Sequence, residues 1–76
     1  MEKLLRILSE IRPEVDFQTD AKLIDDGILD SIDIIALVGE INERFDIQIG
    51  VENLLPENFN SAHAMMEMIE RLQNEN

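Results

Sequence analysis

The sequence predicts an all-α protein, a bundle of three main helices and one short helix with a long ordered loop after the first helix. Three stretches carry apolar residues at the i, i+3, i+4 and i+7 spacing of one helix face. Strand-like alternation is limited to one short segment, Asp46 to Gly50. The chain has 76 residues, enough for one modest core, so we expect a single domain over residues 1–76.

The first helix is expected from Glu2 to about Ile11, with an apolar stripe of Leu4, Leu5, Ile7, Leu8 and Ile11. It should stop at Arg12, because the residue before a proline is biased away from helical angles. The connection from Pro13 to Asp30 has no periodicity, and loops of this length in compact domains are usually functional or anchored. We expect a short helical turn near Ala21 to Ile24 and six anchoring side chains: Val15, Phe17, Leu23, Ile24, Ile28 and Leu29.

The second helix is expected from Ser31 to Phe45, with Asp30 as its N-cap. The Asp30 carboxylate can accept hydrogen bonds from backbone N–H groups, and its charge suits the positive end of the helix dipole. The stripe that should contact the core is Ile34, Leu37, Val38, Ile41 and Phe45.

Three residues of this helix, Ile32, Ile35 and Gly39, project roughly opposite to the core stripe, where a helix that buries one face should be polar. Two explanations stay open. These residues could form a docking surface for a partner, or a neighbouring loop or short helix could cover them.

Short elements are expected after the second helix. Ile47 and Ile49 should face inward from an extended segment. Residues 51–55 could form a short helix that ends before Pro56 and buries Leu54 or Leu55, and Phe59 should plug the core.

Ser61 can cap a last helix from Ala62 to about Gln73, and the tail from Gln73 to Asn76 should fray. Its methionines could form an adaptable binding face, but their spacing favours a place in the core. The expected buried stripe is Ala62, Met65, Met66, Ile69 and Leu72.

The charge balance limits the classes of partner. Six Lys and Arg residues against 17 Asp and Glu residues give a net charge of −11, which argues against nucleic acid and anionic membranes and favours partners with basic surfaces. Cysteine is absent, so any thiol chemistry has to come from an attached group. The longest apolar run is too short to span a bilayer, and the charged start of the chain is unlike a signal peptide. We expect a cytoplasmic monomer that does not insert into membranes.

The residues offer little for catalysis by the chain itself. Nucleophilic catalysis needs a base beside the serine, and the only histidine, His63, should lie on the exposed side of the last helix. A calcium loop centred on Gly27 would place Lys22 and Ile24 at the first two ligand positions and Asp33 where glutamate is expected. We therefore expect no enzyme activity and no metal site.

Ser31 is instead well placed to be modified, because an exposed hydroxyl at a helix N-terminus presents an attached phosphate to backbone N–H groups and the favourable dipole end. Asp30-Ser31-Ile32, preceded by Asp26-Gly27-Ile28-Leu29, resembles the phosphopantetheine attachment site of the acyl carrier protein family. The resemblance covers essentially the whole chain, including Phe45-Asp46-Ile47 at the end of the second helix and Phe59-Asn60-Ser61 before the last.

The resemblance implies an acyl-carrier-like bundle and the function of a free-standing carrier. Ser31 would receive 4′-phosphopantetheine from coenzyme A through a separate Mg²⁺-dependent phosphopantetheinyl transferase, and the arm's thiol would carry acyl or aminoacyl groups as thioesters. The helix from Ser31 would be the main recognition helix for that transferase, a loading ligase and downstream transferases. The residues expected to contact these partners are Asp30, Ile32, Asp33, Ile35, Gly39, Glu40 and Glu43.

The cargo stays open at this point. Fatty-acid-type carriers usually have Asp-Ser-Leu after a Leu-Gly-Ala-like turn, whereas Gly27-Ile28-Leu29-Asp30-Ser31 is more similar to D-alanyl carrier proteins and stand-alone peptidyl carriers. Fatty acyl or polyketide cargo therefore competes with an amino acid loaded by an adenylating ligase. Outside the carrier class, the alternative is an acidic module that binds a partner without any prosthetic group.

Overall fold

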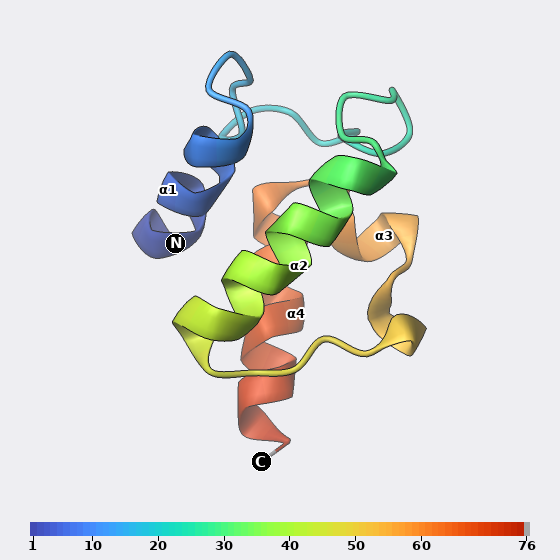
Figure 1. Ribbon diagram of the computed structural model, residues 1–76. Coiled ribbons are helices and arrows are strands. Elements are labelled where there is room, and N and C mark those ends of the chain that lie inside the picture. Colours follow the sequence, from blue (N-terminus) through green and yellow to red (C-terminus); the bar gives the residue numbers. More distant parts are fainter. Residues whose placement is uncertain (76) are drawn as a thin grey trace.

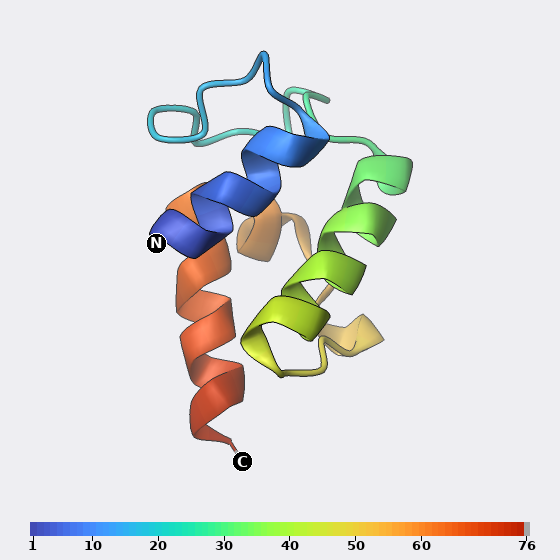
Figure 2. The ribbon, with the colours of Figure 1, turned by 60° about the vertical axis from the view of Figure 1, so that its left-hand side comes forward.

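Four α-helices and one 3₁₀ turn make up the fold of the computed structural model, which describes residues 1–75. They are α1 (Glu2–Ile11), α2 (Ser31–Phe45), the 3₁₀ turn η1 (Val51–Asn53), α3 (Pro56–Phe59) and α4 (Ala62–Asn74). In Figures 1 and 2, α1, α2 and α4 surround the core, and the loop between α1 and α2 crosses one end of the bundle. The predicted all-α bundle of three main helices and a short one is confirmed.

The ends of α1 and α2 follow from local sequence signals. Arg12 leaves the helical region just before Pro13, while its backbone N–H still donates to the Leu8 carbonyl oxygen at 2.9 Å. α2 ends at Asp46, whose φ of 53° lies in the left-handed region that Asp adopts more readily than most residues. Both ends agree with the boundaries expected from the sequence.

The last helix begins as predicted and runs slightly further. The Ser61 hydroxyl accepts a hydrogen bond from the Ala64 N–H at 3.0 Å, which caps the first turn of α4. Gln73 and Asn74 are helical, so the expected fraying is wrong for these two residues. Asn76 lies outside the described residues.

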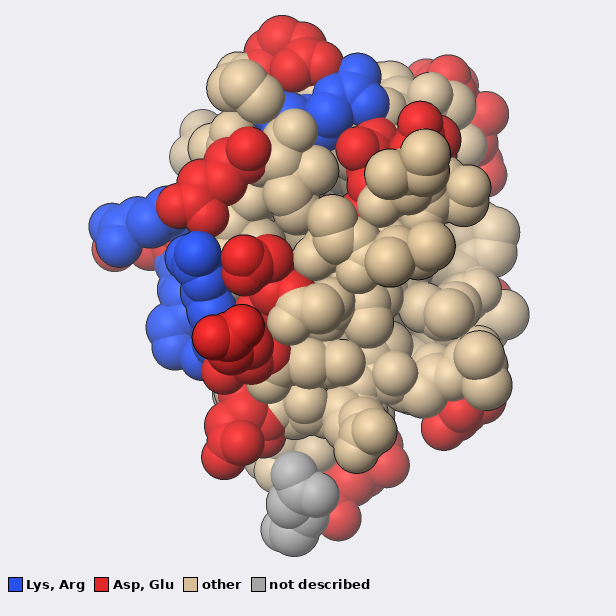
Figure 3. Space-filling view, viewed as in Figure 1, with Lys and Arg blue, Asp and Glu red and all other residues tan. Residues whose placement is uncertain are grey.

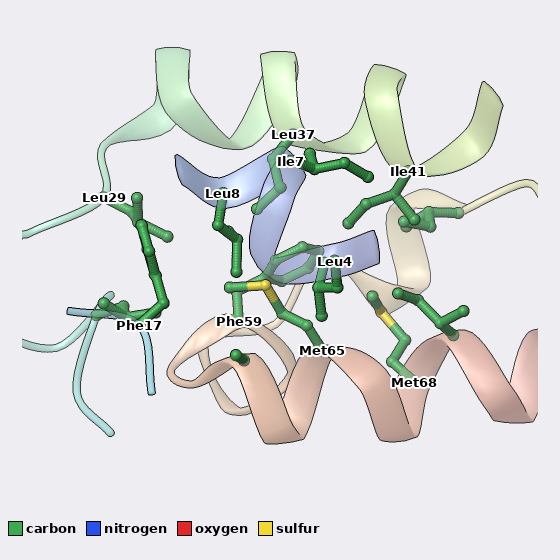
Figure 4. Close-up of a cluster of buried hydrophobic side chains, with 14 of the residues drawn as sticks. Leu4, Ile7, Leu8, Phe17, Leu29, Leu37, Ile41, Phe59, Met65 and Met68 are labelled. Carbon is green, nitrogen blue, oxygen red and sulfur yellow. The ribbon is translucent and has the colours of Figure 1, made fainter. Parts of the chain in front are cut away.

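Apolar side chains from the three main helices, from α3 and from the loop meet in one core (Figure 4). Phe59 is 2% exposed and lies beside Met65, as expected of a plug. Met68 is fully buried although the expected stripe omitted it, whereas Met66 is only half-buried. The buried set is Leu4, Ile7, Leu8, Phe17, Leu23, Leu29, Leu37, Ile41, Ile47, Ile49, Phe59, Ala62, Met65, Met68 and Ile69.

The segment around Pro56 differs from the prediction. The expected helix over residues 51–55 is reduced to the single 3₁₀ turn η1, and Pro56 begins α3 instead of following a helix. Proline is well suited to the first helical position, because the N–H that it lacks would have no intrahelical partner there. Leu54 and Leu55 are consequently 42% and 44% exposed, so the expected burial of one of them is wrong.

The loop between α1 and α2 is ordered by buried anchors. Phe17, Leu23 and Leu29 are 5%, 0% and 4% exposed, as the anchoring hypothesis requires. The helical turn expected near residues 21–24 lies slightly later, where the Asp26 N–H donates to the Lys22 carbonyl oxygen at 2.8 Å.

Among residues 1–75, no helix has the length and apolar character needed to cross a membrane.

Candidate functional site

Ser31 is the first residue of α2, directly after a reciprocal cap. The Asp33 N–H donates to Asp30 Oδ1 at 2.9 Å, and the Asp30 N–H donates to Asp33 Oδ2 at 3.2 Å. This capping box fixes the backbone on both sides of Ser31. The Ser31 side chain is exposed, and no other described residue hydrogen-bonds its hydroxyl.

Hydrogen bonds from the loop to Asn60, which lies between α3 and α4, hold the loop before Ser31; we call these bonds the Asn60 tether. Asn60 Oδ1 accepts from the N–H groups of Ile24 and Asp25 at 3.0 and 3.1 Å, and the Asn60 carbonyl oxygen accepts from the Leu23 N–H at 2.9 Å. The turn closes at Gly27, whose φ of +71° suits a residue without a Cβ. Ser31 is therefore delivered by a loop that is held against the α3–α4 junction.

The guanidinium of Arg12 links the end of α1 to the start of α2. It donates to Asp33 Oδ2 at 2.8 Å, to the Ile28 carbonyl oxygen at 3.0 Å and to Glu14 Oε2 at 2.7 Å. The pKa of Glu14 is lowered by its own backbone N–H and by the Arg12 guanidinium, which both stabilise the carboxylate. The sequence identified Arg12 only as the end of a helix and Asn60 only as part of a motif, because neither belongs to a periodic pattern.

The apolar residues opposite the core stripe of α2 remain uncovered. Ile32 and Ile35 are 75% and 73% exposed, and a Cβ added to Gly39 would meet no atom within 4 Å. The alternative that a loop or short helix covers them is therefore wrong for the described residues. Sequence reasoning missed a further exposed residue, Val51 at 83%, which joins Leu54 and Leu55 as accessible apolar side chains.

The acidic residues expected to contact partners fall into two groups. Asp30 and Glu43 are exposed. Asp33 already serves the cap and Arg12, with a side chain 15% exposed, and Glu40 Oε2 lies 3.7 Å from Arg44 Nε. Their contact with partners stays a prediction, and both Asp30 and Asp33 have a structural role in the cap as well.

The surface around α2 combines apolar and acidic chemistry. Figure 3 shows a broad area without charged side chains across the face that α2 presents, with acidic side chains around much of its margin.

The histidine lies on another helix. His63 is on the first turn of α4, its side chain is 81% exposed, and its Nε2 atom lies 3.5 Å from Glu67 Oε1. No described contact connects His63 to Ser31. Within residues 1–75, the site thus offers an exposed hydroxyl and a surface, and the histidine side chain does not bond that hydroxyl.

Comparisons with known proteins agree with this arrangement. A family model described as a phosphopantetheine attachment site matches residues 2–69. The chain is also 32% identical over 73 residues to proteins named D-alanyl carrier protein from Streptococcus sanguinis, Streptococcus gordonii and Streptococcus thermophilus, and each match covers 95% of this chain and 92% of the relative. Members of this family bear a covalent 4′-phosphopantetheine and serve other enzymes with it. This chain is therefore a carrier protein and belongs to the phosphopantetheine-binding family.

Proposed function

We propose that Ser31 is the residue that carries 4′-phosphopantetheine. The observation that supports this most directly is the exposed Ser31 hydroxyl on a helix N-terminus whose cap is supplied by its neighbours Asp30 and Asp33. Because the cap does not use the serine side chain, the hydroxyl can be esterified without loss of a helix-stabilising contact. The backbone N–H groups and the dipole of α2 favour a phosphate at that position. When bound, the group supplies a thiol that holds cargo as a thioester.

We further propose that the cargo is an amino acid of the D-alanine class, loaded by an adenylating ligase. The relatives named D-alanyl carrier protein match over nearly the whole chain, which favours this class over fatty acyl or polyketide cargo. The segment from Gly27 to Ser31 has the same resemblance. The proposal places the protein in the cytoplasm, where coenzyme A and ATP are available.

The partner surface of this proposal is the exposed side of α2. Ile32 and Ile35 supply apolar contacts, and Asp30, Glu40 and Glu43 supply charges that complement a basic partner. Gly39 leaves room for close approach by a transferase or ligase. The carrier itself acts as the substrate of these enzymes and performs no catalysis.

Intact mass measures the attachment directly. The purified protein is incubated with coenzyme A, Mg²⁺ and a broad-specificity phosphopantetheinyl transferase, and one added phosphopantetheine is expected. The chain has three serines, which provide a matched pair of variants: Ser31→Ala should fold normally and gain no mass, while Ser9→Ala, at an exposed position of α1, should be modified like the parent. Modification of Ser31→Ala, or none of the folded parent, would overturn the assignment, and the second result would favour the unmodified interaction module.

The cargo is tested on the modified protein. It is offered D-alanine, ATP and a D-alanine-activating ligase in one reaction, and a fatty acid, ATP and an acyl-carrier synthetase in another. A D-alanyl thioester, detected by mass and released by hydroxylamine, is the expected product. Efficient acylation by the fatty acid without aminoacylation would overturn the cargo proposal and leave the attachment site intact.

A further inference from the structure

One side chain holds the chain on both sides of Ser31. The Arg12 guanidinium donates to the Ile28 carbonyl oxygen at 3.0 Å and to Asp33 Oδ2 at 2.8 Å, that is, three residues before the serine and two residues after it. Asp33 Oδ2 also accepts the Asp30 N–H at 3.2 Å, so Arg12 and the cap share one oxygen atom. The segment that contains Ser31 is thus fixed at its two ends by Arg12, the residue that follows α1.

We propose that Arg12 is a positioning residue for the modification of Ser31. The inference rests on the proposed attachment at Ser31 and adds a residue that acts on that hydroxyl through Ile28 and Asp33. In the proposed attachment, Ser31 Oγ forms a bond to the pantetheine-side phosphorus of coenzyme A. The P–O bond of the pyrophosphate breaks, adenosine 3′,5′-bisphosphate leaves, and the hydroxyl proton passes to the transferase or to solvent. The rate therefore depends on how well Ser31 Oγ is oriented toward that phosphorus. Arg12 does not contact Ser31 and is not a catalytic residue.

The chemistry of the contact suits this role. A guanidinium is planar and permanently charged, and it can donate to several oxygen atoms in a fixed geometry that an ammonium cannot reproduce. The two side chains are sheltered, with Arg12 33% exposed and Asp33 15% exposed, so solvent weakens the pair less than a fully exposed one. Without the guanidinium, Asp33 Oδ2 would lose its charged donor and keep only the hydrogen bond from the Asp30 N–H.

Arg12 lies where its loss should affect the orientation of Ser31 more than the stability of the whole bundle. Arg12 is not a member of the buried core, and it caps α1 through its backbone N–H, which any residue except proline can supply. Its loss should therefore leave the bundle folded and loosen mainly residues 28–33. The N–H groups of Asp30 and Asp33 should exchange faster, whereas the Ala64 N–H, held by Ser61 Oγ at 3.0 Å in the cap of α4, provides an internal reference.

The test compares Arg12→Gln with Lys22→Gln. Both variants remove one positive charge, and Lys22 is an exposed residue of the same loop. With a broad-specificity phosphopantetheinyl transferase, Arg12→Gln should lower kcat for Ser31 modification about tenfold with a smaller change in KM. Lys22→Gln should stay within about twofold of the parent. Arg12→Lys, which keeps the charge and loses the planar fork, should fall between the parent and Arg12→Gln, and it remains informative if Arg12→Gln does not fold.

A double-mutant cycle identifies the path of the effect. If Arg12 acts through Asp33, then Arg12→Gln should slow modification much less in an Asp33→Asn background than in the parent. Equal rates for Arg12→Gln and Lys22→Gln, or unchanged exchange of the Asp30 and Asp33 N–H groups, would overturn the inference. Failure of the parent to be modified would instead overturn the proposed attachment at Ser31, so the two failures are distinguishable.

Discussion

Replacement of Asn60 by alanine tests whether a single side chain holds the loop that precedes Ser31. Asn60→Ala removes the Oδ1 acceptor of two backbone N–H groups, those of Ile24 and Asp25. It also removes the exposed bond of 3.3 Å from Asn60 Nδ2 to Asp25 Oδ2, which should contribute little, and it keeps the carbonyl oxygen that accepts from Leu23. The substitution therefore deletes the side-chain part of the tether and leaves its backbone part in place. No apolar core residue is changed.

The expected loss of stability follows from the environment of each bond. The N–H of Ile24 is partly buried, so its lost bond should cost about 1 to 1.5 kcal/mol, including incomplete replacement by water. The N–H of Asp25 is exposed and can be rehydrated, so about 0.5 kcal/mol is expected there. The sum of about 1.5 to 2 kcal/mol corresponds to a decrease in Tm of about 6–16 °C for a domain of this size.

Urea titration measures the change in unfolding free energy, and amide exchange shows where it arises. The N–H groups of Ile24 and Asp25 should lose protection, while that of Leu23 keeps part of its protection. Asn42→Ala is the matched control, because Asn42 Oδ1 accepts one N–H bond from Ile49 in the other long connection. It should cost less than about 1 kcal/mol, since alanine also raises helix propensity in α2, and it should not affect Ile24.

One result would refute this reasoning: the unfolding free energy of Asn60→Ala lies within about 0.5 kcal/mol of the parent value and the N–H groups of Ile24 and Asp25 exchange at unchanged rates. The loop would then not depend on the Asn60 side chain. The buried anchors Leu23 and Leu29 would then be sufficient to order it.

Four other perturbations have signs fixed by the sequence and the structure. Gly39→Ala should raise the unfolding free energy, measured by urea titration, by about 0.5–1 kcal/mol, because Gly39 is helical and nothing lies within 4 Å of the added Cβ. Gly27→Ala should lower the unfolding free energy by about 1–2 kcal/mol, because the φ of Gly27 is +71°. The opposite ranking of the two variants would contradict the backbone conformation at these glycines. Raising NaCl from about 20 mM to about 500 mM should increase Tm, because it screens repulsion in a chain of net charge −11, and salt-independent melts would count against this. The pKa of Glu14 is lower in the folded protein than its ordinary value of 4.5, so its contribution to stability is present above pH 4.5 and is lost as the pH falls through the folded-state pKa. Glu14→Gln should therefore make the unfolding free energy depend less on pH in that acidic range. Urea titrations at several pH values would measure this, and an unchanged pH dependence would contradict it.

Periodic apolar spacing was sufficient to predict the three main helices. Leu4, Leu37 and Ile69 recur with the period of a helix face, and each is buried as expected. Ser31 could be proposed as the attachment site as well, because the cap at Asp30, which the structure contains, and the attachment motif coincide there. Such features depend on neighbours in the sequence, so they can be recognised without knowledge of the tertiary structure.

Features that depend on distant residues could not be predicted. The contacts of Arg12 and Asn60 join segments separated by many residues, and no local pattern distinguishes these two side chains from other polar ones. The interpretation of residues 51–55 as a helix failed because a proline can follow the end of one helix or occupy the first turn of the next, and Pro56 does the latter. Met68 was missed because α4 buries a wider face than the expected stripe.

The Asn60 tether also has a consequence for the order of folding. It joins residues 36 positions apart, so forming it requires the intervening chain to lose more conformational entropy than a local turn within a helix does. The loop before Ser31 should therefore be among the last parts to become native, and Asn60→Ala should accelerate unfolding with little change in the refolding rate. A modifying enzyme would therefore meet Ser31 in its native conformation only after the segment around Asn60 has folded.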